Sequence, residues 1–339
     1  MQHKLSSGPL LNENGNLCEA GYAFSMVKEY DRKAIKAGKM RIKEWDYYYI
    51  GNNDYGIALT IADNSYMSLV SVSLLDFNEK WFITKSYMGF LSNGKIGLPS
   101  TSKIGDVCYK DKNCEMNFYN DGKQRHLVVN FKNLTKSKDF SCDVILKETG
   151  PDSMVIATPF NKDKHFYYNQ KINCLKASGT AVYDNKEYSL DNCYGVLDWG
   201  RGVWTYSNTW YWASMSGVSN NVPIGFNLGY GFGDTSAASE NVFFYDGKAY
   251  KLEDVAFNIP GDGTKKINYM EPWHFTSSDG SIDMIFTPLV DRHDDTDALI
   301  IKSLQHQVFG VFKGYVILNG NKVEFDNMLS FAEKVKNCW

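Results

Sequence analysis

Strand-length runs separated by tight-turn dipeptides constrain the fold of this chain more than any other feature. From Trp45 the sequence reads WDYYYI, YGIALTIAD, MSLVSVSLLDF and KWFITKSYMGF, with Asn, Asp or Gly between most of the runs. Asn-Gly and Asp-Gly favour the positive backbone angles of two-residue hairpin loops. Such dipeptides begin at Asn14, Asn93, Asp121, Asp246, Asp279 and Asn319. The pattern therefore predicts antiparallel strands joined by hairpins in an up-and-down order.

The length of 339 residues and the many aromatic side chains predict two separate β-sheets. At roughly 150 residues per domain the chain has room for about two domains, and an aromatic content of 15% favours strands over helices. The segment TPFNKDK, residues 158–164, interrupts the strand pattern. We therefore expect two all-β domains, residues 1–160 with an irregular lead-in and residues 161–339 with the tryptophan-rich segment. Each is an antiparallel barrel or curved sheet of about eight strands, a size that can hold a small ligand, and the two are packed together. Helices are few, the clearest being Asp31 to Ile42.

The net charge and the lack of certain motifs argue against several classes of binding partner. The formal net charge of -3 provides no basic field for nucleic acid or for an anionic membrane surface. The N-terminus lacks a signal-peptide pattern, and no run of about 18 apolar residues occurs, which predicts a cytoplasmic protein without a membrane span. The seven cysteines are scattered and never spaced as CxxC. The acidic run DRHDDTD, Asp291 to Asp297, lacks the glycine and the closing glutamate of a calcium loop, so we expect a solvated loop, no metal and no cofactor.

The stretch from Asp198 to Glu240 is the strongest candidate for a functional site. Four of the eight tryptophans fall within it: Trp199, Trp204, Trp210 and Trp212. Asp198 precedes Arg201 by three residues, and we expect a turn hinged at Gly200 to fold the guanidinium back onto the carboxylate. An aromatic pocket would keep the carboxyl protonated and suited to general acid catalysis, whereas a paired arginine would favour the carboxylate. The alternative is a structural ion pair that fixes a loop between the two barrels.

The later part of this stretch predicts one wall of a binding site. On a strand, Trp210 and Trp212 project to one face and Tyr211 to the other. With Trp204 they can form a wall for an apolar ligand or a platform for a sugar ring, or else an ordinary barrel core. Asn227 lies among closely spaced glycines, which in a strand mark a bend or the close approach of a ligand or of the opposite barrel wall.

Four further residues, Glu240, His306, Asp46 and Trp45, are secondary candidates. Glu240 is either a second carboxylate facing Asp198 or a charge at a strand end. His306 is either a proton shuttle or a hydrogen-bonded strand residue. Asp46 is expected at the mouth of the first barrel, with Trp45 packed inside it or at the interface, unless the aspartate only caps a turn.

Several segments together resemble a known family. They are KEWDYYYI, LDWGRGVW, TWYWASMSG, FNLGYGFGDTSAASENVFFYDGK, PWHFTSSDGSIDMIFTP and HQVFGVFKGYVILNG, with LNENG near the start. Through these segments the chain resembles, essentially from end to end, the bacterial family called domain of unknown function 2804. More distantly, the implied fold is similar to the two-barrel, lipocalin-like architecture of carotenoid hydratases, tocopherol cyclases and fungal Diels-Alderases. That resemblance implies an apolar ligand in or between the barrels and assigns no residue a role.

Three functions from different classes remain open at this point. The first is a hydratase, isomerase or cyclase that acts on a small apolar molecule. In it Asp198 donates a proton, Arg201 orients the acid, and the tryptophan faces stabilise a cationic intermediate. The second is a noncatalytic lipocalin-like binding protein. The third is a carbohydrate-active enzyme with Asp198 and Glu240 as paired carboxylates.

Overall fold

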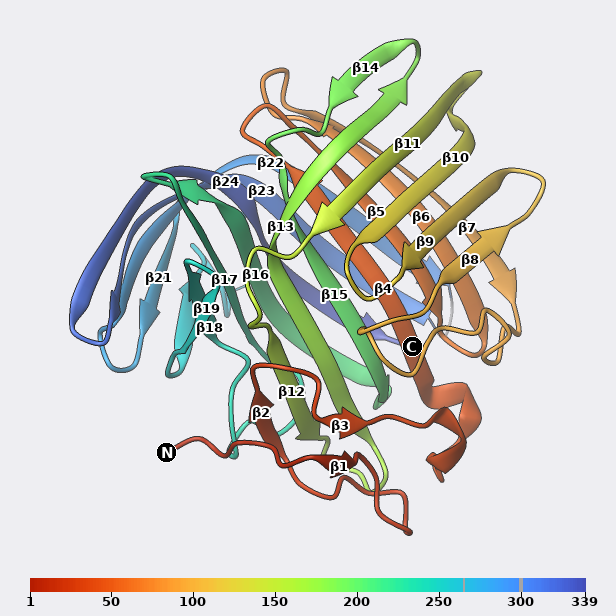
Figure 1. The fold of residues 1–339 in the computed structure, drawn as a ribbon, viewed down its shortest axis with the longest axis vertical. Helices are drawn as coiled ribbons and strands as arrows, with labels where there is room; N and C mark the ends of the chain where they lie inside the picture. Colours follow the sequence, from red (N-terminus) through yellow and green to blue (C-terminus); the bar gives the residue numbers. More distant parts are fainter. Residues whose placement is uncertain (265, 299–300) are drawn as a thin grey trace.

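The protein, described by a computed structural model over residues 1–264, 266–298 and 301–339, consists almost entirely of antiparallel strands in two curled sheets (Figure 1). The first sheet has 13 strands, in the order β7-β6-β5-β4-β15-β13-β11-β10-β9-β8, with β12 and β14 paired to β13 and β2 paired to β12. Its strands are β2 (Gly21–Ala23), β4 (Ile42–Gly51), β5 (Tyr55–Asp63), β6 (Met67–Asp76), β7 (Trp81–Phe90), β8 (Val107–Lys110), β9 (Cys114–Asn120), β10 (Arg125–Thr135), β11 (Lys138–Lys147), β12 (Met154–Pro159), β13 (Phe166–Tyr183), β14 (Lys186–Ser189) and β15 (Tyr194–Val203).

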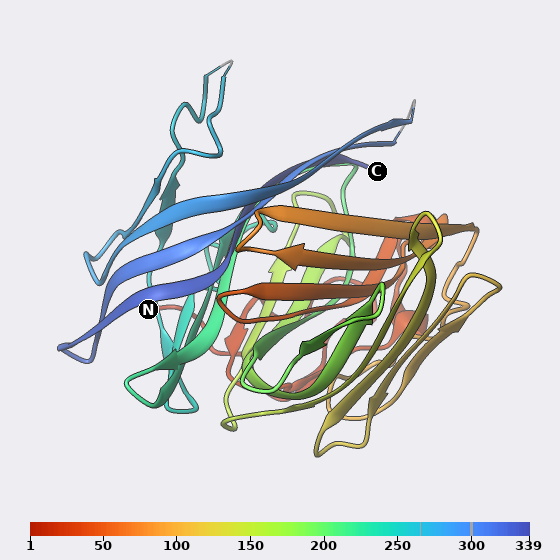
Figure 2. The ribbon, with the colours of Figure 1, turned by 90° about the horizontal axis from the view of Figure 1, so that it is seen from above.

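The second sheet has 9 strands, in the order β19-β18-β17-β16-β24-β23-β22-β21-β20. They are β16 (Ser207–Ser219), β17 (Val222–Tyr230), β18 (Val242–Tyr245), β19 (Lys248–Lys251), β20 (Val255–Asn258), β21 (Trp273–Ser277), β22 (Ile282–Ala298), β23 (Ile301–Leu318) and β24 (Asn321–Cys338). A separate parallel pair is formed by β1 (Gly8–Pro9) and β3 (Lys28–Glu29) in the N-terminal lead-in. Figure 2 shows the long strands β22, β23 and β24 running alongside the first sheet. The predicted all-β class with two packed curved sheets is confirmed.

The turn chemistry acts as the sequence pattern predicts. Asp246 and Gly247 join β18 to β19, and Asn319 and Gly320 join β23 to β24. All four residues have positive φ angles, 50° and 74° in the first turn and 49° and 83° in the second. These angles are the ones that two-residue hairpin loops require.

Three other expectations differ from the structure. The segment Asp31 to Ile42 is not an α-helix, because it forms only two short 3-10 turns, η1 (Arg32–Ala34) and η2 (Lys39–Arg41). The acidic run Asp291 to Asp297 is not a loop, because it continues β22 in register with β23. The chain passes from the first sheet to the second between Val203 and Ser207, so the expected boundary at residues 160 and 161 lies inside the first sheet. Among the described residues no helix has the length and apolar character needed to cross a membrane.

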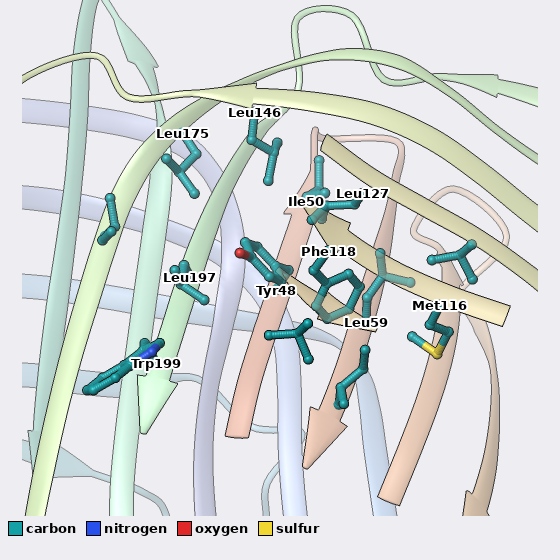
Figure 3. Close-up of a cluster of buried hydrophobic side chains, with 14 of the residues drawn as sticks. Tyr48, Ile50, Leu59, Met116, Phe118, Leu127, Leu146, Leu175, Leu197 and Trp199 are labelled. Atoms are coloured by element: carbon teal, nitrogen blue, oxygen red, sulfur yellow. The ribbon is translucent and has the colours of Figure 1, made fainter. Parts of the chain in front are cut away.

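The buried apolar side chains form three clusters that follow from strand alternation. One lies inside the curl of the first sheet, where Tyr48 and Phe118 meet from facing strands with ring centroids 5.1 Å apart (Figure 3). A second lies inside the curl of the second sheet. The third, which we call the interface layer, lies between the sheets and includes Tyr47, Tyr167 and Trp212. Because successive side chains on a strand point to opposite faces, one strand supplies both an interior and the interface layer.

A kink in β13 connects the two sheets. The register of β13 against β15 shifts between Ile172 and Leu175, and Cys174 has a φ of 58°. In this bulge the Asn173 side-chain amide donates to Ser214 Oγ at 2.9 Å and to the Phe226 carbonyl oxygen at 3.0 Å, both in the second sheet. The bulge therefore brings β13 against β16 and β17.

Candidate functional site

Asp198 and Arg201 lie on opposite faces of one strand. Both belong to β15, which pairs without interruption with β4 over Tyr194 to Val203. Residues three apart on a strand point in opposite directions, so the guanidinium does not reach the Asp198 carboxylate. The predicted turn at Gly200 and the predicted Asp198–Arg201 pair are therefore wrong. The reason is that hydrogen bonds to β4 and β13 keep this glycine-containing segment extended.

Asp198 instead faces the interface layer and contacts two side chains from β13. Lys171 Nζ lies 2.8 Å from Asp198 Oδ1, and the Asn169 amide donates to the same oxygen at 2.6 Å. The Lys171 ammonium also lies over the Trp212 ring, 3.9 Å from its centre. The side chains of Lys171 and Asp198 are only 2% and 10% exposed, so each depends on the other for its charge partner.

Glu240 is a second buried carboxyl group near this pair. Tyr167 donates a hydrogen bond to Glu240 Oε2 at 3.3 Å, whereas no donor from the described part of the chain reaches Oε1. Burial raises the pKa of Glu240, and the Asp198 charge adds to the rise, while the Lys171 charge opposes it. Relative to an exposed glutamate, the environment of Glu240 shifts the balance toward the protonated form, and its Oε1 atom has no hydrogen-bond partner among the described residues.

Trp212 and Asn227 hold the backbone that carries this carboxyl. The Trp212 indole donates to Asn227 Oδ1 at 2.7 Å, and the Asn227 amide donates to the Glu240 carbonyl oxygen at 3.0 Å. A Cβ at Gly229 would lie 2.5 Å from Glu240 Oε1, so only glycine leaves room for the carboxyl. A Cβ at Gly225 would lie 2.6 Å from the Met215 carbonyl oxygen of β16 and 2.7 Å from Cys174 Sγ of the first sheet, so of the two neighbours expected there the structure places the opposite wall close by.

A second polar chain crosses the interface layer from Trp210. Its indole donates to Glu333 Oε1 at 2.9 Å, and the Gln307 amide donates to Glu333 Oε2 at 2.9 Å. Gln307 Oε1 in turn accepts from Arg292 at 2.5 Å and from the Tyr47 hydroxyl at 3.3 Å. Burial raises the pKa of Glu333, so this carboxyl also tends toward its protonated form.

A group of aromatic rings in the interface layer packs around Trp204, whose ring centroid lies 5.4 Å from that of Trp210 and 5.8 Å from that of Trp45. Tyr167 stacks on Phe232 at 4.9 Å and contacts Trp204 edge-on at 5.6 Å. The tryptophans at 204, 210 and 212 thus share the layer with Asp198 and Glu240, as one wall of a site requires.

Arg201, Trp199 and Asp46 lie on the other face, inside the first sheet (Figure 3 shows Trp199 there). Arg201 lies 3.1 Å from Asp46 Oδ1, and its guanidinium carbon is 4.1 Å from the centre of the Trp199 ring. Asp46 therefore lines the interior of the first sheet. Its neighbour Trp45 packs in the interface layer, one of the two positions expected for it.

His306 lies away from both carboxyl groups. It shares its face of β23 with Val308, inside the curl of the second sheet. Its Nδ1 lies 2.7 Å from Asp291 Oδ2, and its ring stacks on Tyr269 with centroids 3.8 Å apart. The structure thus does not bring His306 to Asp198. Among the described residues, no group of three or more His, Cys, Asp or Glu side chains gathers in an arrangement that could hold a metal ion.

Five charged or amide side chains of the interface layer were not predicted as site residues: Asn169, Lys171, Arg292, Gln307 and Glu333. A signal for Lys171 was available. Tyr167, Asn169 and Lys171 alternate along β13, so a polar group on every second residue marks one face of this strand. For Arg292 and Glu333 the sequence holds no comparable sign, because these two residues lie on separate strands far apart along the chain.

Two curled antiparallel sheets with a polar cluster buried between them define an all-β protein of the two-domain, lipocalin-like class. The chain belongs to the family described as a domain of unknown function (DUF2804), and the match covers residues 2–339. No curated protein matches the sequence.

Three solved structures are similar to this chain to different degrees. A protein of Nitrosomonas europaea described as an AttH is 13% identical, with a TM-score of 0.53 over 90% of this chain and 95% of that chain. The kievitone hydratase of Nectria haematococca is 11% identical, with a TM-score of 0.49 over 88% of each chain. CghA with Sch210972 is 8% identical, with a TM-score of 0.47 over 98% and 97% of the two chains. At 13% identity the likeness to the Nitrosomonas europaea protein concerns the fold alone.

Proposed function

We propose that this protein is an enzyme that transfers a proton to a small, largely apolar molecule bound between the two sheets. The observation that carries the proposal is Glu240. This carboxyl group is 2% exposed, its pKa is raised by burial, and Oε1 meets no donor in the described part of the chain. A carboxylic acid kept neutral in an aromatic site is suited to act as a general acid.

The reaction type that fits this arrangement begins with protonation of a carbon–carbon double bond. The Glu240 O–H bond breaks, a C–H bond forms, and the substrate becomes a cation. The ring faces of Trp212 and Tyr167 favour positive charge beside them. Attack by water gives hydration, loss of a different proton gives isomerisation, and attack by a second double bond gives cyclisation.

Asp198 takes the complementary role in this proposal. It accepts hydrogen bonds from Lys171 and Asn169, which are the contacts of a carboxylate. An ionised Asp198 can accept the proton that the attacking water or the cation releases. This assignment exchanges the roles expected from the sequence, in which Asp198 was the donor. Because all of these groups are buried, side chains of the interface layer must move before a substrate reaches Glu240.

The experiment is a turnover assay on a panel of small alkenes and enones. Hydration adds the mass of one water, whereas isomerisation and cyclisation change the chromatographic retention at constant mass. Glu240→Gln is expected to lower the rate by about 100-fold or more, the usual contribution of a general acid. Asp198→Asn is expected to lower turnover while leaving ligand affinity in place. Exposed Glu324→Gln is the matched control and should keep the wild-type rate.

The other two functions are outcomes of the same set of measurements. A lipid retained in native mass spectrometry, with no turnover of it and no effect of Glu240→Gln, favours a noncatalytic binding protein. A thermal shift with sugars but not with apolar ligands favours a carbohydrate-active enzyme with Asp198 and Glu240 as its carboxylates. If the assay identifies a substrate and Glu240→Gln turns it over at the wild-type rate, Glu240 is not the general acid.

A further inference from the structure

A small polar cavity lies inside the first sheet, on the face of β15 opposite to Asp198. Its volume is about 10 Å³, enough for roughly one water molecule. It lies beneath residues 91–106, the glycine-containing connection between β7 and β8, which we call the covering loop. Its lining includes Asp46, Arg125, Trp199, Tyr48, Phe118 and Leu197.

Two buried arginines attach the covering loop to this interior. Arg201 donates to the Pro99 carbonyl oxygen from Nη2 at 2.9 Å and from Nε at 3.3 Å. Arg125 donates to the Ser102 carbonyl oxygen at 3.0 Å. The two arginines are 0% and 4% exposed. Neutral carbonyls thus occupy positions where a carboxylate would form stronger, charge-assisted hydrogen bonds to the same guanidinium groups.

Two donors around the cavity have no partner in the described part of the chain. They are Arg125 Nε and Trp199 Nε1, on residues that are 4% and 1% exposed. A buried N–H without an acceptor costs free energy, so its persistence calls for an explanation. Asp46 contacts Arg201, whereas the carboxyl that contacts Arg125 belongs to Glu148, whose side chain is 43% exposed. The interior is therefore richer in donors than in acceptors.

A larger pocket lies on the other side of the covering loop. Its volume is about 500 Å³, and Ser100, Thr101 and Lys103 form part of its wall, with Lys28 and Tyr30 among the others. Thr101 lines both this outer pocket and the inner cavity. Residues 99–103 are therefore the partition between them, and a displacement of this segment would join the two spaces.

We propose that the first sheet encloses a second ligand site, for a small molecule that carries a carboxylate on an apolar body. The molecule enters from the outer pocket, and its carboxylate binds Arg125 and Arg201 in place of the Pro99 and Ser102 carbonyl oxygens. Tyr48, Phe118 and Leu197 contact the apolar body. This site is independent of the proposed proton transfer at Glu240, because β15 lies between the two.

The test measures binding of benzoate to the full chain by calorimetry, with benzyl alcohol as the neutral analogue of the same shape and inorganic phosphate as a different anion. Hydrogen exchange of the amides in residues 99–105 is followed in parallel. Benzoate is expected to bind and to increase exchange in this segment, whereas benzyl alcohol does neither. Equal binding of the alcohol, binding of phosphate alone, no binding of benzoate, or unchanged exchange on benzoate binding overturns the proposal.

Two variants with opposite expected effects on benzoate affinity distinguish a ligand site from arginines that only hold the covering loop in place. Arg125→Gln is expected to weaken benzoate on the order of tenfold or more, the loss of one charge-assisted interaction. Ser102→Ala removes the hydrogen bond to Gln170 that also holds the loop, so it is expected to strengthen benzoate binding several-fold. Arg41→Gln, at an arginine that lines neither space, is the matched control.

An unchanged benzoate affinity in Arg125→Gln, or weaker binding in Ser102→Ala, contradicts the assignment. If Arg125→Gln does not fold, the Ser102→Ala result and the exchange data on the wild-type protein still decide it.

Discussion

Lys171 and Asp198 form a buried ion pair between neighbouring strands, with 2.8 Å between Nζ and Oδ1. The partners come from β13 and β15 of the first sheet, and the same ammonium lies 3.9 Å from the centre of the Trp212 ring on β16 of the second. One cation therefore contacts both sheets. Removing either charge leaves the other without compensation in a dry environment, which is costly, whereas removing both is much less so.

Substitution of this pair should be strongly non-additive. Asp198→Ala is expected to lower the free energy of unfolding by about 3–5 kcal/mol, because Lys171 is left buried and unpaired. The double variant Asp198→Leu with Lys171→Met should lose much less than the sum of its single changes. Urea denaturation of the wild type, the single variants and the double variant measures the coupling. Additive losses would mean that the pair contributes nothing as a unit.

The raised pKa of Glu240 predicts a pH dependence of stability with a definite sign. The folded protein keeps a proton on Glu240 above the ordinary pKa of 4.5, whereas the unfolded chain releases it. The free energy of unfolding therefore falls as pH rises from about 4.5, by up to about 1.4 kcal/mol per pH unit until the folded pKa is passed. Glu240→Gln should remove this part of the slope and be more stable than the wild type at neutral pH.

Chemical denaturation of the wild type and of Glu240→Gln at a series of pH values tests this prediction. The quantity compared is the difference between their free energies of unfolding at each pH. Glu333, whose pKa is also raised by burial, contributes the same slope to both and cancels. The exposed Glu324, paired with Lys322, supplies the control Glu324→Gln, which should change stability little. Parallel pH curves for the wild type and Glu240→Gln would show that Glu240 is already ionised in the folded protein.

Lys43 should produce a slope of the opposite sign at higher pH. Burial lowers the pKa of Lys43 from 10.5 to about 7, and the Arg41 charge adds to the effect. Its Nζ faces the Tyr66 ring at 3.9 Å and the Asn64 carbonyl oxygen at 3.2 Å, with the Asp63 charge opposing the shift. Between about pH 7 and 10.5 the unfolded chain binds the proton that the folded protein has lost, so stability rises with pH.

The variant Lys43→Met tests this by removing the group. Relative to it, the wild type should gain stability between pH 7 and 9, measured by denaturant unfolding on both proteins. Lys322→Met, at a lysine on the surface, should leave the wild-type slope intact. A constant difference between the wild type and Lys43→Met across this range would contradict the lowered pKa.

Gly200 should tolerate no side chain, because Trp45 packs directly on it. A Cβ at this position would lie 2.1 Å from atoms of the Trp45 ring. Gly200→Ala is therefore expected to cost about 1–3 kcal/mol of unfolding free energy through displacement of the ring. At Gly38 nothing lies within 4 Å of an added Cβ and φ is -60°, so Gly38→Ala should be neutral or stabilising by up to about 1 kcal/mol. Equal effects of the two changes would exclude this packing.

Part of the candidate site was predictable from local pattern. Alternation along β16 placed Trp210 and Trp212 on one face, and the glycines around Asn227 indicated close neighbours, which at Gly225 are the Met215 carbonyl oxygen and Cys174 of the first sheet. The pairing of Asp198 was not predictable in this way. Its partner Lys171 is distant in sequence and comes next to it only because β13 and β15 are neighbours in the sheet.

The sequence by itself determined the all-β class, the hairpin turns and the alternation of faces along the strands that it predicted, because these depend on backbone angles and on an alternation of period two. Only the tertiary structure decided that β15 is a strand between β4 and β13. That placement turned Asp198 toward Lys171 and Glu240, and turned Arg201 toward Asp46. The physical reason is that a strand's neighbours are chosen by long-range packing, so which buried charge meets which partner is not encoded within any one segment.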